Sequence, residues 1–275
     1  MNASSPAGSG EPAGLVGRRG LLRLAGAAGL ATVVAACSAG RAPADDSAAP
    51  TQTSAAEVAP PITPSPARQP TVAPSLQKAV IPGQLCRDGW GAQPARPGGV
   101  PHTPARMTIH HTATALGDNS NIFERLRQHQ RYHQDQLGWI DIAYHLGVDR
   151  HGNIYQMRDP QIKGDTATNY EPAGHFLVVV EGDFDQETVT AAQLDGAARA
   201  FAWSAATFGI SPETLAGHRD VSHDTSCPGA NLHTHVVSGE LKRRIENHLA
   251  TGPLDLPVIC LPEAKGMVSA IQGGM

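Results

Sequence analysis

One polar stretch, Ala216–His233, constrains the fold of this chain more than any other. It reads AGHRDVSHDTSCPGANLH and holds two metal-ligating side chains, His218 and Cys227. Gly217 precedes the histidine, and a proline and a glycine follow the cysteine, which favours a fixed loop over a continuing helix. A neutral imidazole and a thiolate are good zinc ligands, and a catalytic zinc takes three protein ligands and keeps one position open. The sequence therefore predicts a zinc site whose third ligand comes from elsewhere.

The best candidate for the third ligand lies upstream, where Met107–Ile109 reads as a short strand that runs into His110 and His111. Neighbouring side chains on a strand point to opposite faces, so only one of these two histidines can face the metal. A second pair, His129 and His133, has helical i, i+4 spacing, but glutamine follows its first histidine where a zinc protease carries glutamate. We therefore interpret His129 and His133 as packing or surface residues.

The start of the chain reads as an export signal. Arg18 and Arg19 precede an apolar stretch, Leu21–Val34, which is shorter than the about 20 apolar residues of a membrane span. GRRGLLR resembles a twin-arginine signal, and VAAC resembles a bacterial lipobox that ends in Cys37. The resemblance implies that residues 1–37 are a lipoprotein signal and that Cys37 is lipidated. A transmembrane anchor and a soluble exported form are the alternatives.

A change of composition separates this signal from a packed domain. Residues 38–80 are rich in Ala, Pro, Ser and Thr, and such a segment cannot bury enough apolar surface to offset its ordering entropy. We expect a disordered tether there, a folded domain over residues 86–250 and a C-terminal tail over residues 251–275. The expected location is the outer face of the cytoplasmic membrane, or the cell envelope, with a lipid anchor.

The domain itself shows alternating strand and helix patterns. The expected strands are Met107–His110, Ile142–Val148, Ile154–Met157 and Phe176–Glu181. The expected helices are about Asn121–Leu137, Ala191–Phe208 and Ser238–His248. Asp149–Asn153 predicts a hairpin turn, and Thr190 with Gln193 predicts a capping box before the second helix. This order favours the α/β class, with a mixed central sheet flanked by helices.

Four motifs in register now carry a family resemblance. They are WGA at Trp90–Ala92, IHHTAT at Ile109–Thr114, YHLGVDRHGNIYQMRD at Tyr144–Asp159 and GHRDVSHDTSCPG at Gly217–Gly229. Together they resemble the zinc-dependent N-acetylmuramoyl-L-alanine amidases, the family that includes phage amidase-type lysozymes and peptidoglycan recognition proteins. The match runs from roughly Arg87 to roughly Leu249, and it implies the amidase fold.

The resemblance also assigns roles at the site. It implies that His110, His218 and Cys227 bind Zn²⁺, with His111 pointing away from the metal. It implies a catalytic role for Tyr144, whose hydroxyl orients water or binds the oxyanion, and an oxyanion role for Thr225.

Two departures from the family pattern concern the loops of the site. The interval from His218 to Cys227 is one residue longer than the commonest family spacing. The loop before the central strand reads KGDTATNYEPAGHF, where many members carry a histidine. We keep Asp165, Thr166 and Asn169 from this loop as candidate substrate contacts.

The cysteines divide by role. With Cys37 lipidated and Cys227 on zinc, Cys86 and Cys260 remain, one at each end of the domain. In an exported protein these two are a candidate disulfide pair.

The expected function follows from the resemblance: zinc-dependent hydrolysis of the amide between N-acetylmuramic acid and L-alanine, with peptidoglycan or muropeptides as partners. A non-catalytic peptidoglycan receptor or scaffold is the alternative, although members of that kind typically lose a zinc ligand. A zinc peptidase for another amide is a third reading. The net charge of −4 argues against nucleic-acid binding. The sequence predicts no oligomeric state.

Overall fold

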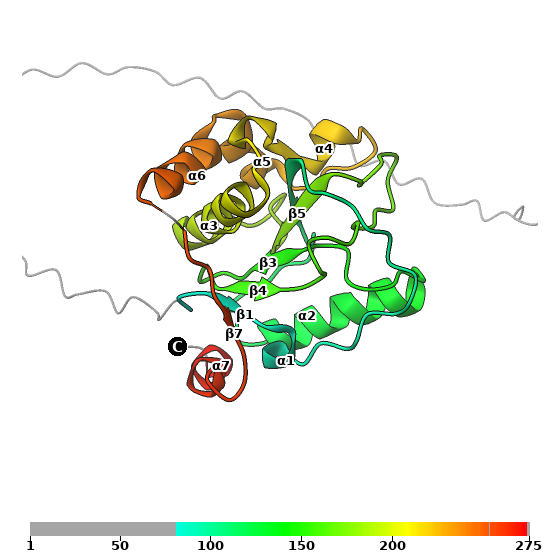
Figure 1. Cartoon of the computed structure of the whole chain (residues 1–275), viewed down its shortest axis with the longest axis vertical. Coiled ribbons are helices and arrows are strands. Elements are labelled where there is room, and N and C mark those ends of the chain that lie inside the picture. The colour runs from blue at the N-terminus through cyan, green and yellow to red at the C-terminus, as the bar shows by residue number, and fades with distance from the viewer. Residues whose placement is uncertain (1–80, 253, 274–275) are drawn as a thin grey trace, which may run out of the picture. The chain divides into compact units, whose positions relative to one another are not determined.

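The computed structural model describes residues 81–252 and 254–273 (Figure 1). This part of the chain forms a seven-stranded sheet in the order β6-β2-β5-β3-β4-β1-β7, in which only β3 and β4 pair antiparallel. The strands are β1 (Gln84–Leu85), β2 (Arg106–His111), β3 (Leu146–Val148), β4 (Ile154–Gln156), β5 (His175–Val180), β6 (Ala216–Gly217) and β7 (Val258–Ile259). The predicted mixed α/β sheet is confirmed.

Helices cover both faces of the sheet (Figure 1). They are α1 (Arg87–Trp90), α2 (Ile122–Arg131), α3 (Ala191–Phe208), α4 (His218–Val221), α5 (Ala230–Val237), α6 (Glu240–Ala250) and α7 (Lys265–Gln272). A π-helical turn, Tyr132–Gln136, follows α2, and a 3-10 turn, Pro212–Thr214, precedes β6. The predicted signal, lipidated Cys37 and tether lie outside the described residues. None of the helices within residues 81–252 and 254–273 is long and apolar enough to cross a bilayer.

Strand β5 shows why the core has two layers. Its HFLVVV run is buried at every position. Phe176, Val178 and Val180 pack in the cluster with α3 and α6, whereas Val179 packs in the cluster with α1 and α2. A central strand covered on both faces is apolar at successive positions and does not alternate.

Local signals placed two elements as predicted. Thr190 Oγ1 accepts from Gln193 N at 3.0 Å and Thr190 N donates to Gln193 Oε1 at 3.0 Å, so α3 begins with a capping box. Gly209, with φ of 70°, ends the helix. Asp149–Asn153 joins β3 to β4, and Gly152 has φ of 81°.

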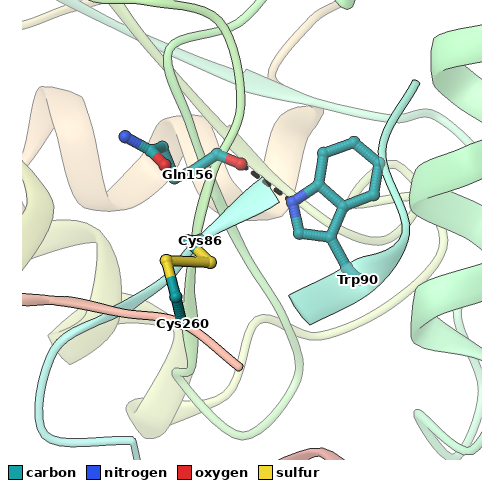
Figure 2. The surroundings of a disulfide bond; sticks show 4 residues. All are labelled: Cys86, Trp90, Gln156 and Cys260. Carbon is teal, nitrogen blue, oxygen red and sulfur yellow. Dashed lines mark hydrogen bonds between the residues drawn. A yellow bond between two sulfur atoms is a disulfide. The ribbon is translucent and has the colours of Figure 1, made fainter. Parts of the chain in front are cut away.

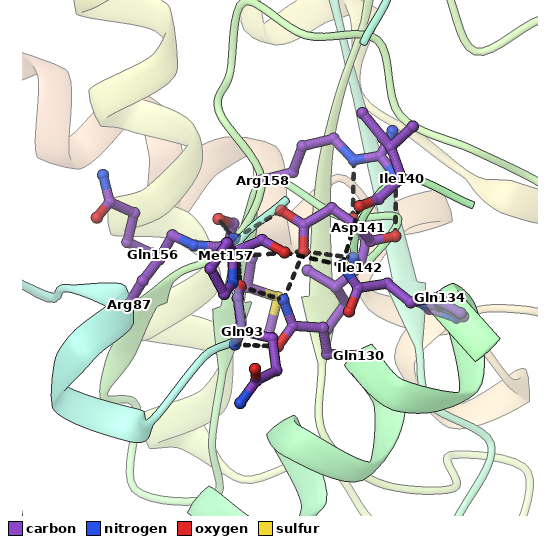
Figure 3. Close-up of polar contacts among 12 residues, drawn as sticks. Arg87, Gln93, Gln130, Gln134, Ile140, Asp141, Ile142, Gln156, Met157 and Arg158 are labelled. Atoms are coloured by element: carbon purple, nitrogen blue, oxygen red, sulfur yellow. Dashed lines mark hydrogen bonds and ion pairs between the residues drawn. The ribbon is translucent and has the colours of Figure 1, made fainter. Parts of the chain in front are cut away.

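Three boundaries differ from the predictions. The strand expected from Ile142 begins only at Leu146, because the Arg158 guanidinium takes the carbonyls of Asp141 and Ile142 (Figure 3). The helix expected to Leu137 changes to π geometry after Arg131. The last expected helix, Ser238–His248, begins two residues late, because Gly239 takes a left-handed φ of 71° and α6 starts after it.

The C-terminal segment adds an edge to the sheet. Strand β7 pairs parallel to β1, and a disulfide joins Cys86 to Cys260 with a Cα–Cα distance of 5.2 Å (Figure 2). Beside the bridge, Trp90 Nε1 donates to the carbonyl of Gln156 at 2.8 Å. This edge is the one farthest in strand order from β2 and β6.

Candidate metal centre

Three separate segments bring His110, His218 and Cys227 together. Strand β2 ends with His110 and His111, and β6 pairs parallel to it, with Ile109 opposite Gly217. The carboxyl ends of both strands therefore meet at one edge, and the rings of His110 and His218 lie 4.6 Å apart between centroids. The loop after α4 returns Cys227, and the three ligand atoms lie within 4.8 Å of one another.

The donor set fits zinc. Cys227 Sγ lies 3.6 Å from His110 Nδ1. A tetrahedral zinc with bonds of about 2.3 Å to sulfur and about 2.1 Å to nitrogen holds such atoms roughly 3.6 Å apart. All three side chains are buried. Two imidazoles and one thiolate leave a fourth position open, as catalytic zinc sites require.

Burial sets the protonation of these ligands. It lowers the pKa of His218 to about 4 and that of His110 well below its ordinary value, so both rings are neutral at pH 7. Burial raises the pKa of the Cys227 thiol to about 12. Both imidazoles are therefore free of the extra proton that would block metal binding, whereas a metal ion would have to displace the proton of the thiol.

His111 points away from these ligand atoms, as the resemblance implied. Its Nδ1 accepts from Phe184 N at 3.2 Å, and its ring stacks on that phenyl ring. Gly229 makes this packing possible, because its φ is 85° and an added Cβ would lie 2.6 Å from the Phe184 carbonyl carbon. The glycine after the Cys–Pro step thus keeps the ligand loop close to β2.

The ligands open into a hollow of about 260 Å³ that also holds Tyr144 and Thr225. The Tyr144 ring lies 5.1 Å from the His110 ring, and burial, followed by the nearby Cys227, raises the pKa of its phenol. A neutral hydroxyl is therefore available beside the metal. Thr225 Oγ1 accepts from Cys227 N at 3.1 Å, so this hydroxyl also braces the ligand loop.

The loop between β4 and β5 contributes differently from the prediction. Asp165 and Thr166 line the hollow, and Asp165 is paired with Arg158 at 2.6 Å. Asn169 is absent from the lining and donates to Asp224 at 3.0 Å. Thr168, which sequence reasoning missed, lies 2.7 Å from Nε2 of His218. Its only signal in the sequence was membership of this loop.

His129 and His133, which follow β2 in the chain, line the hollows beside the candidate metal centre. His133 Nδ1 accepts from Ala143 N at 3.2 Å, and His133 lines the hollow beside Tyr144. His129 lines an adjoining hollow of about 290 Å³, and its Nδ1 lies 3.3 Å from the carboxylate of Glu181. Glu181 is fully buried. The interpretation of His129 and His133 as packing or surface residues was incomplete, because both line hollows and His129 contacts Glu181. The spacing of residues along a helix does not show which other segments the helix will face.

A polar network supports the segment that carries Tyr144 (Figure 3). Asp141 accepts from Gln130 Nε2 at 2.7 Å and from Ile142 N at 2.8 Å, and it pairs with Arg87 at 2.8 Å. The Arg158 guanidinium holds the neighbouring carbonyls from the other side. These bonds fix a non-strand backbone two residues before the tyrosine.

The comparisons with known proteins agree with this geometry. The family model described as N-acetylmuramoyl-L-alanine amidase matches residues 101–230. Peptidoglycan-recognition protein SC2 of Drosophila simulans is 35% identical over 127 residues, which cover 45% of this chain and 67% of that protein. The human N-acetylmuramoyl-L-alanine amidase is 32% identical over 154 residues, which cover 54% of this chain and 26% of that protein.

Solved structures show the same fold. A human peptidoglycan recognition protein fragment in complex with glycosamyl muramyl pentapeptide matches with a TM-score of 0.52 and 26% identity. The match covers 57% of this chain and 96% of that one. With the sequence relatives and the site in agreement, the chain belongs to the family of N-acetylmuramoyl-L-alanine amidases and peptidoglycan recognition proteins.

Proposed function

We propose that this protein is a zinc-dependent amidase that hydrolyses the bond between N-acetylmuramic acid and L-alanine in peptidoglycan or its fragments. One observation carries the proposal: a complete His110, His218 and Cys227 ligand set lies in one hollow with Tyr144. A binding protein needs the hollow but has no need of a buried set of three metal ligands. The names of the relatives include both an amidase and recognition proteins, so binding alone is the competing function.

The residues present fit the chemistry of amide hydrolysis. Bound zinc would lower the pKa of a coordinated water and polarise the scissile carbonyl. Tyr144, neutral and partly buried beside His110, would hydrogen-bond the oxyanion or orient the attacking water. Thr225, two residues before Cys227 on the ligand loop, offers a second hydroxyl in the same hollow. Asp165 and Thr166 line the wall of the hollow and are the proposed substrate contacts.

The other parts of the proposal concern location. We propose that the protein is exported and lipidated at Cys37. The lipid would anchor the protein at the outer face of the membrane, with residues 38–80 as the tether to the folded domain. Globomycin treatment, which blocks lipoprotein processing, tests this: the unprocessed precursor should accumulate, and Cys37→Ala should release the protein from membranes.

Digestion of purified peptidoglycan, with mass spectrometry of the products, tests the activity. The amidase should release stem peptides that begin with L-alanine, and chelator or Cys227→Ser should abolish that release. Cuts within the stem peptide would indicate a peptidase instead. Binding of muropeptides and zinc without any product would refute the amidase proposal in favour of a receptor.

A further inference from the structure

Thr168 controls which nitrogen of His218 can bind a metal. Its Oγ1 lies 2.7 Å from His218 Nε2, so Nδ1 is the nitrogen left for the ion. A neutral imidazole carries one proton, and a metal on Nδ1 leaves that proton on Nε2. Nε2 then donates to Thr168 Oγ1. Outer partners of this kind fix both the tautomer and the ring orientation of metal-binding histidines.

A second hydroxyl continues this chain of hydrogen bonds. Thr166 Oγ1 lies 2.9 Å from Thr168 Oγ1, and it also accepts from Thr168 N at 3.1 Å. Once Thr168 accepts from His218, its own hydroxyl hydrogen is free to donate to Thr166. Thr166 then accepts two bonds and keeps its own hydrogen, and Thr166 lines the hollow.

We propose that Thr168 is a positioning residue that holds His218 in the zinc-binding tautomer, and that this hydrogen bond orients both hydroxyls so that Thr166 presents a donor to a substrate oxygen. The hydrogen bonds then run in one direction, from His218 through Thr168 to Thr166. The loop before β5 thereby couples the zinc-binding tautomer of His218 to recognition of a carbonyl or carboxylate oxygen. The clause on the substrate rests on the proposed function, and the clause on zinc does not.

The structure supplies a control for the contact between the two loops. Asn169 Nδ2 donates to Asp224 Oδ2 at 3.0 Å, and this bond joins the same loop to the ligand loop without touching His218. The bond is exposed. If mere contact between the loops mattered, Asn169→Ala would act like the loss of Thr168. If the hydrogen bond between the Thr168 hydroxyl and His218 Nε2 matters, only loss of the hydroxyl at position 168 lowers the zinc affinity.

Zinc affinity, measured by competition with a chelator, tests the positioning role. Thr168→Val keeps the shape of the side chain and removes the acceptor, and we expect zinc affinity to fall by about 10- to 100-fold. Thr168→Ser restores the hydroxyl and should stay within about threefold of the wild type, as should Thr166→Val and Asn169→Ala. Unchanged affinity in Thr168→Val, or an equal fall in Thr168→Ser, overturns the assignment.

Nitrogen-15 NMR of the metal-free protein gives a readout that a merely structural role would not move. The wild type should show His218 with its proton on Nε2, and Thr168→Val should show a mixture of tautomers. Thermal melting of the same samples checks that each variant folds. The same tautomer ratio in both proteins would contradict the proposal.

Binding of a soluble disaccharide tetrapeptide tests the substrate side, in a Tyr144→Phe background that slows turnover. At saturating zinc, Thr166→Val should weaken binding by about tenfold in the form that keeps Thr168 and much less in the form that carries Thr168→Val, because Thr168 directs the Thr166 hydroxyl. Equal losses in both forms would refute the coupling. Neither this assay nor the zinc assay requires hydrolysis, so a failed amidase activity would leave both results interpretable.

Discussion

Removing the Cys86–Cys260 disulfide should cost stability while sparing the metal centre. The bridge spans 174 residues of chain. Closing so long a loop lowers the entropy of the unfolded chain by the equivalent of about 5 kcal/mol at 25 °C, and measured losses for native bridges run from about 2 to about 5 kcal/mol. Backbone bonds at this edge, from Gln84 N to Pro257 O at 2.8 Å and from Cys86 N to Ile259 O at 3.0 Å, remain in the variant. We therefore expect a loss of about 4 kcal/mol.

Urea denaturation of the Cys86→Ala/Cys260→Ala variant measures the loss of free energy and the m-value, and thermal denaturation measures the melting temperature. The melting temperature should fall by roughly 8 to 16 °C, and the m-value should rise because the unfolded chain expands. The wild type under reducing conditions is the matched control and should behave like the variant. Zinc affinity should not change, since β1 and β7 stand at the opposite edge of the sheet from β6 and β2. A loss below about 1 kcal/mol, or a loss of zinc binding, would refute this reasoning.

Four further predictions concern the site and its support. Zinc affinity should rise about tenfold per pH unit between about pH 5.5 and about pH 7, because Cys227, with a pKa raised to about 12, must lose a proton while His218, with a pKa of about 4, is already neutral. Cys227→Asp introduces an acid of much lower ordinary pKa and should flatten that slope in a chelator competition. Tyr144→Phe should lower kcat by about 10²-fold with zinc affinity unchanged, and an unchanged kcat would remove Tyr144 from the chemistry. Asp141→Ala should cost about 3 kcal/mol in urea denaturation by leaving Arg87 without its carboxylate, and a loss no larger than in Asp159→Ala would contradict this. Gly229→Ala should reduce zinc occupancy, measured by metal analysis, because the new Cβ meets Phe184 in a left-handed backbone.

The sequence predicted those features that rest on local chemistry. The capping box at Thr190, the turn at Gly152 and the buried run of β5 depend on a few neighbouring residues, and the structure contains all three. The proximity of His218 and Cys227 was predictable for the same reason, since they lie nine residues apart in one polar segment, and the structure brings both next to His110.

Features that depend on contacts distant in sequence escaped prediction. The sequence before Tyr144 predicts a strand. In the structure, Arg158, fourteen residues after Tyr144, donates hydrogen bonds to the carbonyls of this segment, and the strand does not form there. Thr168 binds His218 across 50 residues of chain. Glu181 reads as the end of an apolar strand, and nothing local shows that α2 will bury it beside His129. In each case the role of a polar side chain depends on a partner that comes near only when the chain folds.

Two buried polar clusters show how this fold treats structure and site differently. Asp149 accepts from Asn119 Nδ2 at 3.0 Å, from Asn153 Nδ2 at 2.9 Å and from Tyr155 Oη at 2.6 Å, as expected of a cluster that only holds a turn. Among the described residues, the buried side-chain atoms that lack a hydrogen-bond partner are His110 Nε2, Arg125 Nε, Tyr170 Oη and both carboxylate oxygens of Glu181.

These unpartnered atoms gather around the metal centre and its adjoining hollow. Tyr170 lies against the ring of His218 at 5.1 Å between centroids, and Glu181 lies between Arg125 and His129. Each buried polar group without a hydrogen bond costs roughly 1 to 3 kcal/mol. Glu181 has only ion-pair contacts with Arg125 and His129, so a fold selected for stability alone would not concentrate such groups in one place. Polar groups gathered at the carboxyl ends of β2, β5 and β6, beside three converging candidate metal ligands, indicate a region organised to bind a ligand, while the disulfide joins the chain at the far edge, beside β1 and β7.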